Sequence, residues 1–181
     1  EQKLVRDRRG GYCFEQNTLF AAALRALGFT VAPLVARVRW QLPADFPTPL
    51  THMLLRLATP DAGSCLADVG FGSMSLIEPL RFELDREQPA GLEPRRIVAR
   101  GPLFSQQAKL GDTWSDVYLF SGDEAPPIDF EVGNWYTSTF PQSRFRQNLG
   151  ASIAGDACRH TLLNGEFTTR HADGRVERRT L

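Results

Sequence analysis

The chain opens with apolar positions at helical spacing. Residues 14–27, FEQNTLFAAALRAL, place Phe20, Leu24 and Leu27 three or four positions apart. On an α-helix this spacing puts the three side chains on one stripe, and Gly28 follows where a glycine commonly ends a helix. We therefore expect a helix over these residues.

The helical spacing then gives way to the alternation that is typical of strands. Residues 31–40, VAPLVARVRW, and residues 51–59, THMLLRLAT, alternate between two faces, as half-buried strands do. The stretch 60–64, PDAGS, has the composition of a turn, and residues 65–69, CLADV, fit a returning strand. The segments on either side of this turn are expected to form a hairpin.

The apolar positions of this hairpin indicate its register. A hairpin centred on Pro60 sets His52 directly opposite Asp68. The other face then carries apolar side chains, which are Met53, Leu55 and Leu57 from the first strand and Cys65 and Ala67 from the second. We prefer this register because a slip of one residue would turn every side chain of one strand to the opposite face. It predicts two ionisable groups on one face of the sheet.

The second half of the chain is expected to be rich in β-structure. Strand patterns occur at 95–100, 113–120 and 158–163, and hairpin turns are indicated at Asn164-Gly165 and Asp173-Gly174. Residues 122–149 lie between these segments and are polar, aromatic and punctuated by proline. We expect a short helix and a long ordered loop there.

Length and composition indicate an ordinary globular protein. The 181 residues are 42% hydrophobic and 23% charged, which suits one domain, or two small ones, with a real core. Lys plus Arg and Asp plus Glu both number 21, so the formal net charge is zero. A nucleic-acid partner is not expected, because such proteins carry a positive field over the binding face. The short basic runs Arg95-Arg96 and Arg178-Arg179 are interpreted as solvated strand ends.

A membrane partner is not expected either. No apolar run approaches the ~20 residues that cross a bilayer, and no basic-then-apolar signal segment opens the chain. Cys13, Cys65 and Cys158 are odd in number and far apart, unlike the cysteines of a small secreted domain. We therefore expect a cytoplasmic protein. The chain begins at Glu1 and ends inside an apparent hairpin, from which we expect it to be a piece of a longer protein.

Cys13 lies where a cysteine can act as a nucleophile. The reactive form is the thiolate, and a free thiol with a pKa near ~8.5 needs a helix N-terminus or a positive neighbour to ionise at neutral pH. Cys13 directly precedes the expected helix, and Gly10 and Gly11 permit a sharp turn and a close approach of substrate. The free amides of the helix can receive a developing oxyanion. The alternative is an inert thiol buried at a tight turn.

Of the three histidines, His52 is the best candidate for a base. His171 lies beside a hairpin turn and His160 on a terminal strand. His52 has a carboxylate expected opposite it, and Asp68 can fix its tautomer and stabilise its imidazolium form. We therefore interpret Cys13, His52 and Asp68 as a catalytic triad, with a plain His–Asp ion pair as the alternative.

The other two cysteines fit other roles. Cys65 falls on the apolar face of its strand and is expected in the core. Cys158 and His160 have the composition of a metal ligand pair, but no second pair with ligand spacing accompanies them. No metal site is therefore expected.

Several blocks of the sequence resemble one enzyme family. The stretch RRGGYCFEQN at 8–17 resembles the Arg-Gly-Gly-x-Cys-x-Glu-x-Asn signature of the arylamine N-acetyltransferases. THMLLRL at 51–57 resembles their histidine strand, ADVGFG at 67–72 their aspartate turn, and NWYTSTFPQSRFRQNL at 134–149 a further block. The resemblance covers most of the chain. Arg9 and Glu15 of the first block are expected to hold the turn by ion pairs.

The resemblance implies an α+β fold with a cysteine-protease-like, or transglutaminase-like, core. Residues 1–29 would carry the nucleophile on the last helix of an N-terminal helical bundle. Residues 30–130 would form an antiparallel β-barrel that holds the histidine and the aspartate, and residues 131–181 would begin an α/β lid.

The resemblance also implies a ping-pong acetyl transfer. Cys13 would take an acetyl group from acetyl-coenzyme A, a co-substrate, and pass it to an arylamine, arylhydrazine or N-hydroxyarylamine. His52 would move the protons and Asp68 would orient it. The implied partners are a small-molecule amine or hydrazine and coenzyme A, without a metal.

The same resemblance assigns binding residues. It implies an arylamine pocket lined by Phe71, Val38 and Phe145, and coenzyme A contacts from Thr48, Thr51 and Gly72. Phe71 is equally suited to anchoring its turn. Pro49 stands where some members of the family have glycine, which departs from their pattern beside the coenzyme A contact.

Three other functions stay open from the sequence. An amide synthase that releases a polyketide by intramolecular acyl transfer would use the same triad with a different pocket. A cysteine peptidase or transglutaminase-like enzyme would act on peptides without coenzyme A. A non-catalytic thiol or metal-binding module is the third alternative.

Overall fold

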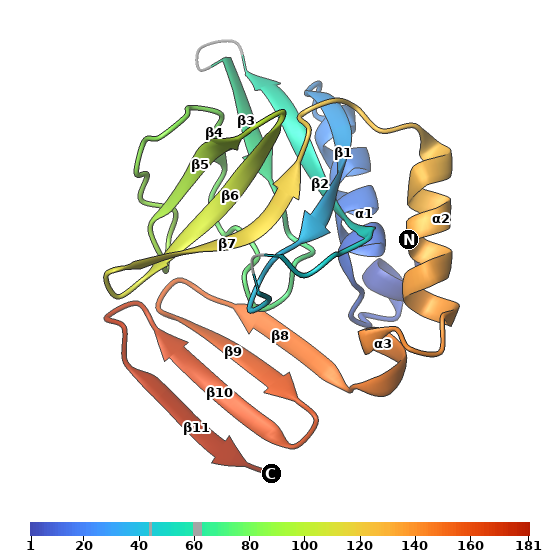
Figure 1. Cartoon of the computed structure of the whole chain (residues 1–181). Helices are drawn as coiled ribbons and strands as arrows, with labels where there is room; N and C mark the ends of the chain where they lie inside the picture. Colours follow the sequence, from blue (N-terminus) through green and yellow to red (C-terminus); the bar gives the residue numbers. More distant parts are fainter. Residues whose placement is uncertain (44, 60–62) are drawn as a thin grey trace.

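The computed structural model describes residues 1–43, 45–59 and 63–181, which form two sheets and a group of helices (Figure 1). The larger sheet has seven antiparallel strands in the order β4-β3-β2-β1-β7-β6-β5. Its strands are β1 (Thr30–Val38), β2 (Leu50–Thr59), β3 (Gly63–Ala67), β4 (Leu80–Arg81), β5 (Arg95–Arg100), β6 (Leu103–Leu110) and β7 (Thr113–Phe120). The strands predicted at 95–100 and 113–120 are confirmed as β5 and β7.

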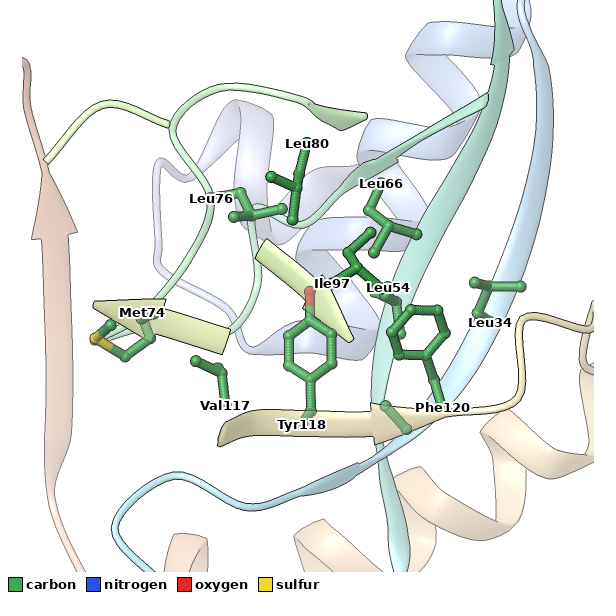
Figure 2. Packing of buried hydrophobic residues seen from close by; sticks show 12 residues of the cluster. Leu34, Leu54, Leu66, Met74, Leu76, Leu80, Ile97, Val117, Tyr118 and Phe120 are labelled. Atoms are coloured by element: carbon green, nitrogen blue, oxygen red, sulfur yellow. The ribbon is translucent and has the colours of Figure 1, made fainter. Parts of the chain in front are cut away.

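The larger sheet curls into a nearly closed barrel. Its edge strands are β4 and β5, and the segment after β4 bridges to β5 through the pairs Leu84–Ile97 and Gln88–Arg95. The barrel interior is filled with buried apolar side chains from most of its strands. Figure 2 shows them converging between the strands, with the ring of Tyr118 among them. The antiparallel barrel and the α+β class are thus confirmed.

The alternation predicted for the β2–β3 hairpin is confirmed, but its register is wrong by two positions. Leu55 pairs with Ala67, so His52 is set diagonally to Asp68 and not directly opposite it. A shift of two positions leaves every side chain on its predicted face, because side chains alternate with a period of two. Pro60, the expected centre of the hairpin, lies outside the described residues.

The first helix, α1 (Cys13–Ala26), begins and ends within one residue of the prediction. The Glu15 carboxylate accepts a hydrogen bond from the Tyr12 amide at 3.2 Å, and Gly28 follows with a φ of +90°, as expected for a glycine that ends a helix. Leu24 is buried, but Leu27 is 75% exposed. The predicted stripe is therefore wrong at Leu27, because the helix ends at Ala26 and Leu27 follows it as the C-cap.

A second core lies between α1 and the outer side of the barrel. It is formed by apolar side chains of α1, β2 and β3, among them Phe14, Met53, Leu55 and Cys65. The second helix, α2 (Pro127–Thr139), lies on the same side of the barrel and packs against β2 (Figure 1). The expected domain boundary after residue 130 falls inside α2, and the division at residues 29 and 130 stays a prediction.

The smaller sheet lies beneath the barrel in Figure 1. Its strands are β8 (Gly150–Ala154), β9 (Cys158–Leu163), β10 (Glu166–His171) and β11 (Val176–Thr180), in the order β11-β10-β9-β8. The turns predicted at Asn164-Gly165 and Asp173-Gly174 join β9 to β10 and β10 to β11, which confirms them.

Three features differ from the expectations or extend them. A short helix, α3 (Arg144–Gln147), lies within the expected loop, and a π-helical turn, η1 (Gln2–Arg6), precedes α1. Arg95 is completely buried, so its interpretation as a solvated strand end is wrong. It is buried because Glu93 pairs with it inside the molecule. No helix in the described ranges has both the length and the apolar character to span a membrane.

Candidate active site

Cys13 is the first residue of α1, where backbone amides have no partner inside the helix. The dipole of the helix favours negative charge at this end. The Cys13 side chain is 4% exposed and belongs to the core between α1 and β2. The predicted position of this thiol at a helix start is confirmed.

His52 and Asp68 form a buried ion pair. The Nε2 atom of His52 lies 2.8 Å from Oδ2 of Asp68, and both side chains are almost completely buried. His52 lies on β2, and Asp68 is the first residue after β3. The contact predicted between two neighbouring strands is therefore present, although the residues are set diagonally.

Burial and pairing act in opposite directions on the pKa values of this pair. Burial alone lowers the pKa of His52, but the charge of Asp68, the hydrogen bond to it and the contact with Cys13 raise that pKa to about 10. Burial alone raises the pKa of Asp68, but the charge and hydrogen bond of His52, together with its other hydrogen bonds, bring it below its ordinary value. His52 is therefore protonated and Asp68 ionised at neutral pH.

The Cys13 thiol completes the group. Its interaction with the imidazole contributes to the raised pKa of His52, and Nδ1 is the ring nitrogen that Asp68 leaves free. The Cys13 Sγ atom also lies 3.7 Å from the carbonyl oxygen of Thr51. Thiol, imidazole and carboxylate thus follow one another in the order in which a proton can move from the thiol to a stabilised imidazolium.

Gly70 lets the segment after Asp68 approach the thiol closely. A Cβ atom at position 70 would lie 2.5 Å from Cα of Cys13 and 2.8 Å from Nδ2 of Asn17. Both distances are too short for any residue with a side chain. The glycine therefore sets how closely Asp68 and Cys13 can be brought together.

Asn17 is a member of the site that sequence reasoning did not single out. Its Nδ2 atom donates to Oδ1 of Asp68 at 3.0 Å and to the Met53 carbonyl at 2.7 Å, and its Oδ1 accepts from the Val69 amide at 3.1 Å. Asn17 lies one helical turn after Cys13 and thus faces the same way. Its position as the last residue of the RRGGYCFEQN block was the feature of the sequence that could have identified Asn17.

Two aromatic rings enclose the imidazole. The centroid of the His52 ring lies 5.0 Å from that of Phe71, in an edge-on contact, and 5.1 Å from that of Tyr118. Burial, together with the negative charge of Asp68, raises the pKa of Tyr118 well above its ordinary value, so this side chain stays a neutral phenol. The rings keep water away from the ion pair. Tyr118 was predicted only as part of a strand.

Comparison with known proteins agrees with this geometry. The N-acetyltransferase family model matches residues 1–181. An arylamine N-acetyltransferase of Mycobacterium tuberculosis is 42% identical over 174 residues, which are 95% of this chain and 62% of the relative. The solved structure of an arylamine N-acetyltransferase from M. tuberculosis matches with a TM-score of 0.95 at 41% identity, over 99% of this chain and 67% of that chain. The chain belongs to the arylamine N-acetyltransferase family.

Other members of the arylamine N-acetyltransferase family match in the same way. A Salmonella typhimurium protein named arylamine N-acetyltransferase / N-hydroxyarylamine O-acetyltransferase is 38% identical over 184 residues, which are 98% of this chain and 63% of that protein. The structure of the Mycobacterium marinum enzyme in complex with CoA matches with a TM-score of 0.95 at 40% identity, over 99% of this chain and 67% of that chain. The chain thus spans between 62% and 67% of the length of these relatives.

The family resemblance assigns three residues to an arylamine pocket, and they come from three separate segments of the chain. Phe71 contacts His52 itself. Val38 ends β1 and pairs with Tyr118 on β7. Phe145 lies on α3, is 62% exposed and contacts the ring of Tyr12, which precedes the nucleophile.

The residues assigned to coenzyme A contacts lie on two segments, one that leads into β2 and one that follows Asp68. Thr51 precedes His52 on β2, and its carbonyl faces the Cys13 thiol. The Thr48 carbonyl accepts a hydrogen bond from Arg37. Gly72 lies in the loop after Asp68, where its φ of +81° favours glycine.

Arg9 and Glu15 were both expected to hold the turn before Cys13 by ion pairs, and Glu15 does so. Glu15 pairs with Lys3 and caps the start of α1. Arg9 is exposed and forms no ion pair with the part of the chain that the structure describes. The ion pair expected for Glu15 is thus present, and its partner is Lys3, which η1 brings to this turn.

The remaining cysteines are placed as expected. Cys65 is buried in the core beside α1, and burial raises the pKa of its thiol. The Sγ atom of Cys158 lies 3.4 Å from Nε2 of His160, but the described residues form no group of three or more side chains that could hold a metal ion. The expectation of no metal stays a prediction.

Two cavities of about 380 Å³ each lie away from the triad. One is at the end of α1 near Gly28 and Thr59, and the other is on the smaller sheet near His160 and Arg179. Neither brings a thiol against an imidazole–carboxylate pair. The chemistry of Cys13, His52 and Asp68 therefore identifies the candidate active site more directly than the volume of a cavity does.

Proposed function

We propose that the protein transfers an acetyl group from acetyl-coenzyme A to an arylamine, arylhydrazine or N-hydroxyarylamine through a thioester on Cys13. The contact of the Cys13 thiol with the buried His52–Asp68 pair carries this proposal. It is supported by the names of the relatives and by the complex of the M. marinum enzyme with CoA.

The first half-reaction begins from a thiolate beside a protonated imidazole. The Cys13 sulfur forms a bond to the acetyl carbon of acetyl-coenzyme A, and the bond from that carbon to the coenzyme A sulfur breaks. His52 gives its proton to the departing sulfur and becomes neutral. The free amides at the start of α1 are suited to stabilise the oxyanion that forms in between.

The second half-reaction returns the site to its starting state. The nitrogen of the arylamine attacks the acetyl carbon, the bond to the Cys13 sulfur breaks, and Nδ1 of His52 takes a proton from the nitrogen. Thiolate and imidazolium are thereby restored. An amide is more stable than a thioester, so this half-reaction runs downhill after a nearly balanced exchange between two thioesters.

The binding residues follow from the same proposal. Phe71 would form the wall of the arylamine pocket next to His52, with Val38 and Phe145 farther out. Thr48, Thr51 and Gly72 would contact coenzyme A. We place the protein in the cytoplasm, where reducing conditions keep the Cys13 thiol free.

Steady-state kinetics test the function. With acetyl-coenzyme A and a substituted aniline varied together, we expect parallel double-reciprocal lines, because coenzyme A leaves before the amine binds. Intersecting lines would contradict the thioester route. Absence of acetyl transfer to any arylamine, combined with cleavage of peptides, would support a cysteine peptidase instead.

The acyl donor is tested in the same assay. A relative from Gibberella moniliformis that is 32% identical over 177 residues is named an N-malonyltransferase. Acetyl-coenzyme A should therefore be compared with malonyl-coenzyme A at equal concentration, and we expect the acetyl donor to be preferred. Preference for the malonyl donor would overturn the acetyl assignment and leave the triad mechanism in place.

A further inference from the structure

Arg159 is a buried arginine that connects the smaller sheet to the segment beside the triad. It lies on β9 and is 2% exposed. Its Nη1 atom donates to the Gly72 carbonyl at 3.3 Å, and its Nη2 atom donates to the Ser75 carbonyl at 3.0 Å. Both carbonyls belong to residues 68–76, here named the Asp68–Leu76 loop, whose ends are joined by a 2.9 Å hydrogen bond from the Leu76 amide to the Asp68 carbonyl.

Arg95 holds the same loop from the barrel. Its Nη2 atom donates to the Met74 carbonyl at 3.2 Å and to the Glu93 carboxylate at 3.0 Å. Arg159 reaches the same oxygen of Glu93 at 3.3 Å. Glu93, Arg95 and Arg159 therefore form one buried charge cluster that binds three carbonyls of the Asp68–Leu76 loop.

Stability alone is a poor explanation for this buried charge cluster. Removing two guanidinium groups and one carboxylate from water is costly, and a buried ion pair often recovers no more than it loses. A guanidinium group does, however, present several donors in a rigid, planar arrangement. Such a group is well suited to fix the path of a loop that has no regular secondary structure.

The other side of the Asp68–Leu76 loop contacts the catalytic group. Gly70 lies against the Cα atom of Cys13, and its amide donates to Asp68 at 3.0 Å. The Phe71 ring meets the His52 ring edge-on, with 5.0 Å between the centroids. Arg159 binds the carbonyl of the next residue, Gly72, so the backbone on the far side of Phe71 is anchored to β9.

We propose that Arg159 is a positioning residue for the active site: by anchoring the Asp68–Leu76 loop to the smaller sheet, it holds Phe71 against His52 and keeps the imidazole between Asp68 and Cys13. This inference rests on the proposed roles of Cys13 and His52. Arg159, in the C-terminal part of the chain, would thereby affect the reaction without contacting the reacting atoms.

The variant Arg159→Met tests this role without leaving a buried charge unpaired, because Glu93 keeps its bond to Arg95. The measurement is the rate constant for alkylation of Cys13 by iodoacetamide, which needs neither acetyl-coenzyme A nor an amine. We expect the rate at about pH 6 to fall about tenfold relative to the rate at about pH 9, because a displaced imidazole no longer takes the thiol proton at low pH. Arg178→Met, at an exposed position on β11, is the control and should keep the wild-type ratio.

Two further variants separate positioning from a merely structural role. Arg159→Lys retains one donor group and should restore part of the pH 6 to pH 9 ratio. Phe71→Leu should lower the ratio by itself, and adding Arg159→Met to it should lower the ratio little further, because both changes act through one contact. If Arg159→Met does not fold, the ratio in Arg159→Lys decides the question, and a wild-type ratio there overturns the inference.

A wild-type ratio in folded Arg159→Met, or losses that simply add in the double variant, would also overturn the positioning role. Neither result would affect the proposed acetyl transfer. Conversely, wild-type protein that is alkylated as expected but transfers no acetyl group would contradict the proposed function and leave the role of Arg159 intact.

Discussion

At the scale of single residues, the site depends on a proton shared among three buried groups. His52 has a pKa of about 10 because the charge of Asp68 and the contact with Cys13 outweigh the effect of burial. A histidine with this pKa holds a proton at neutral pH, and the Cys13 thiol in contact with it can supply that proton.

Replacing the nucleophile tests its role most simply. Cys13→Ser should lower the rate of acetyl transfer by on the order of a thousandfold, because a hydroxyl beside the same base is a much weaker nucleophile at neutral pH. Cys158→Ser, on the smaller sheet, is the matched control and should keep the wild-type rate. Transfer rates are compared after circular dichroism has shown that both variants fold. Retention of most of the activity in Cys13→Ser would rule out a thioester on this residue.

The carboxylate is tested by Asp68→Asn. The amide fills the same space but carries no charge, so the pKa of His52 should fall and the tautomer that accepts the thiol proton should lose its support. We expect kcat to fall by about a hundredfold or more, with a smaller change in the KM for acetyl-coenzyme A. Asp112→Asn, exposed at the β6–β7 turn, should have no effect. An unchanged kcat in Asp68→Asn would leave Asp68 with a structural role alone.

At the scale of secondary structure, the site is the meeting point of α1, β2 and the Asp68–Leu76 loop. The helix provides Cys13 and Asn17, the strand provides His52, and the loop provides Asp68. A local backbone feature positions each side chain. Cys13 depends on the start of a helix, His52 on the alternation of a strand, and Asp68 on the close approach of its loop to α1. A substitution that disturbs one of these features should separate the three groups even where their own chemistry is unchanged.

Gly70→Ala is such a change. The new Cβ would lie 2.5 Å from the Cα atom of Cys13, so backbone must move and the free energy of unfolding should fall by about 1–3 kcal/mol. Alkylation of Cys13 at about pH 6 should slow as the thiol moves away from His52. Gly150→Ala is the control, because a Cβ there meets only the Leu162 carbonyl oxygen, at an ordinary contact distance of 3.9 Å. Urea unfolding and iodoacetamide labelling measure the two effects, and wild-type values for Gly70→Ala would contradict the close approach.

The sequence was sufficient where a local pattern decides the structure. The helix that starts at Cys13, the faces of β2 and β3 and the two C-terminal hairpin turns follow from spacing and turn residues alone. The diagonal register of His52 and Asp68 could not be predicted, because a shift of two positions leaves the hydrophobic pattern unchanged. The burial of Arg95 depends on the Glu93 carboxylate and on the carbonyl of Met74, which is 21 residues away in the sequence, and local charge patterns contain no sign of that second contact.

At the scale of the whole molecule, the His52–Asp68 pair also contributes to stability. The pKa of His52 is raised from 6.5 to about 10 on folding, so the folded state binds this proton more tightly than the unfolded state does. The resulting stabilisation is fully present below about pH 6.5 and is lost as the pH rises through about 10. The lowered pKa of Asp68 acts at the acidic end of the pH range. Its stabilisation is present above pH 3.8, the ordinary pKa of the carboxyl group, and is lost as the pH falls through the lower pKa of the folded state.

This linkage predicts a pH-dependent effect of His52→Gln. The difference in free energy of unfolding between wild type and His52→Gln should be larger at about pH 6 than at about pH 10, because wild-type His52 has begun to lose its proton at the higher pH. Urea unfolding at the two pH values measures both differences. If the difference in free energy of unfolding between wild type and His52→Gln is equal at both pH values, or larger at the higher pH, His52 is not held in its protonated form.

Mass spectrometry tests most directly whether Cys13 carries the acetyl group. The purified protein is mixed with acetyl-coenzyme A in the absence of an amine, stopped in acid and digested, and the peptides are mapped. We expect at most one acetyl group per molecule, on the peptide that contains Cys13, and we expect it to disappear when an arylamine is added before the acid. Acetylation of Cys65 or Cys158 in its place, or a Cys13 peptide that stays unmodified while arylamine is still acetylated, would contradict the claim.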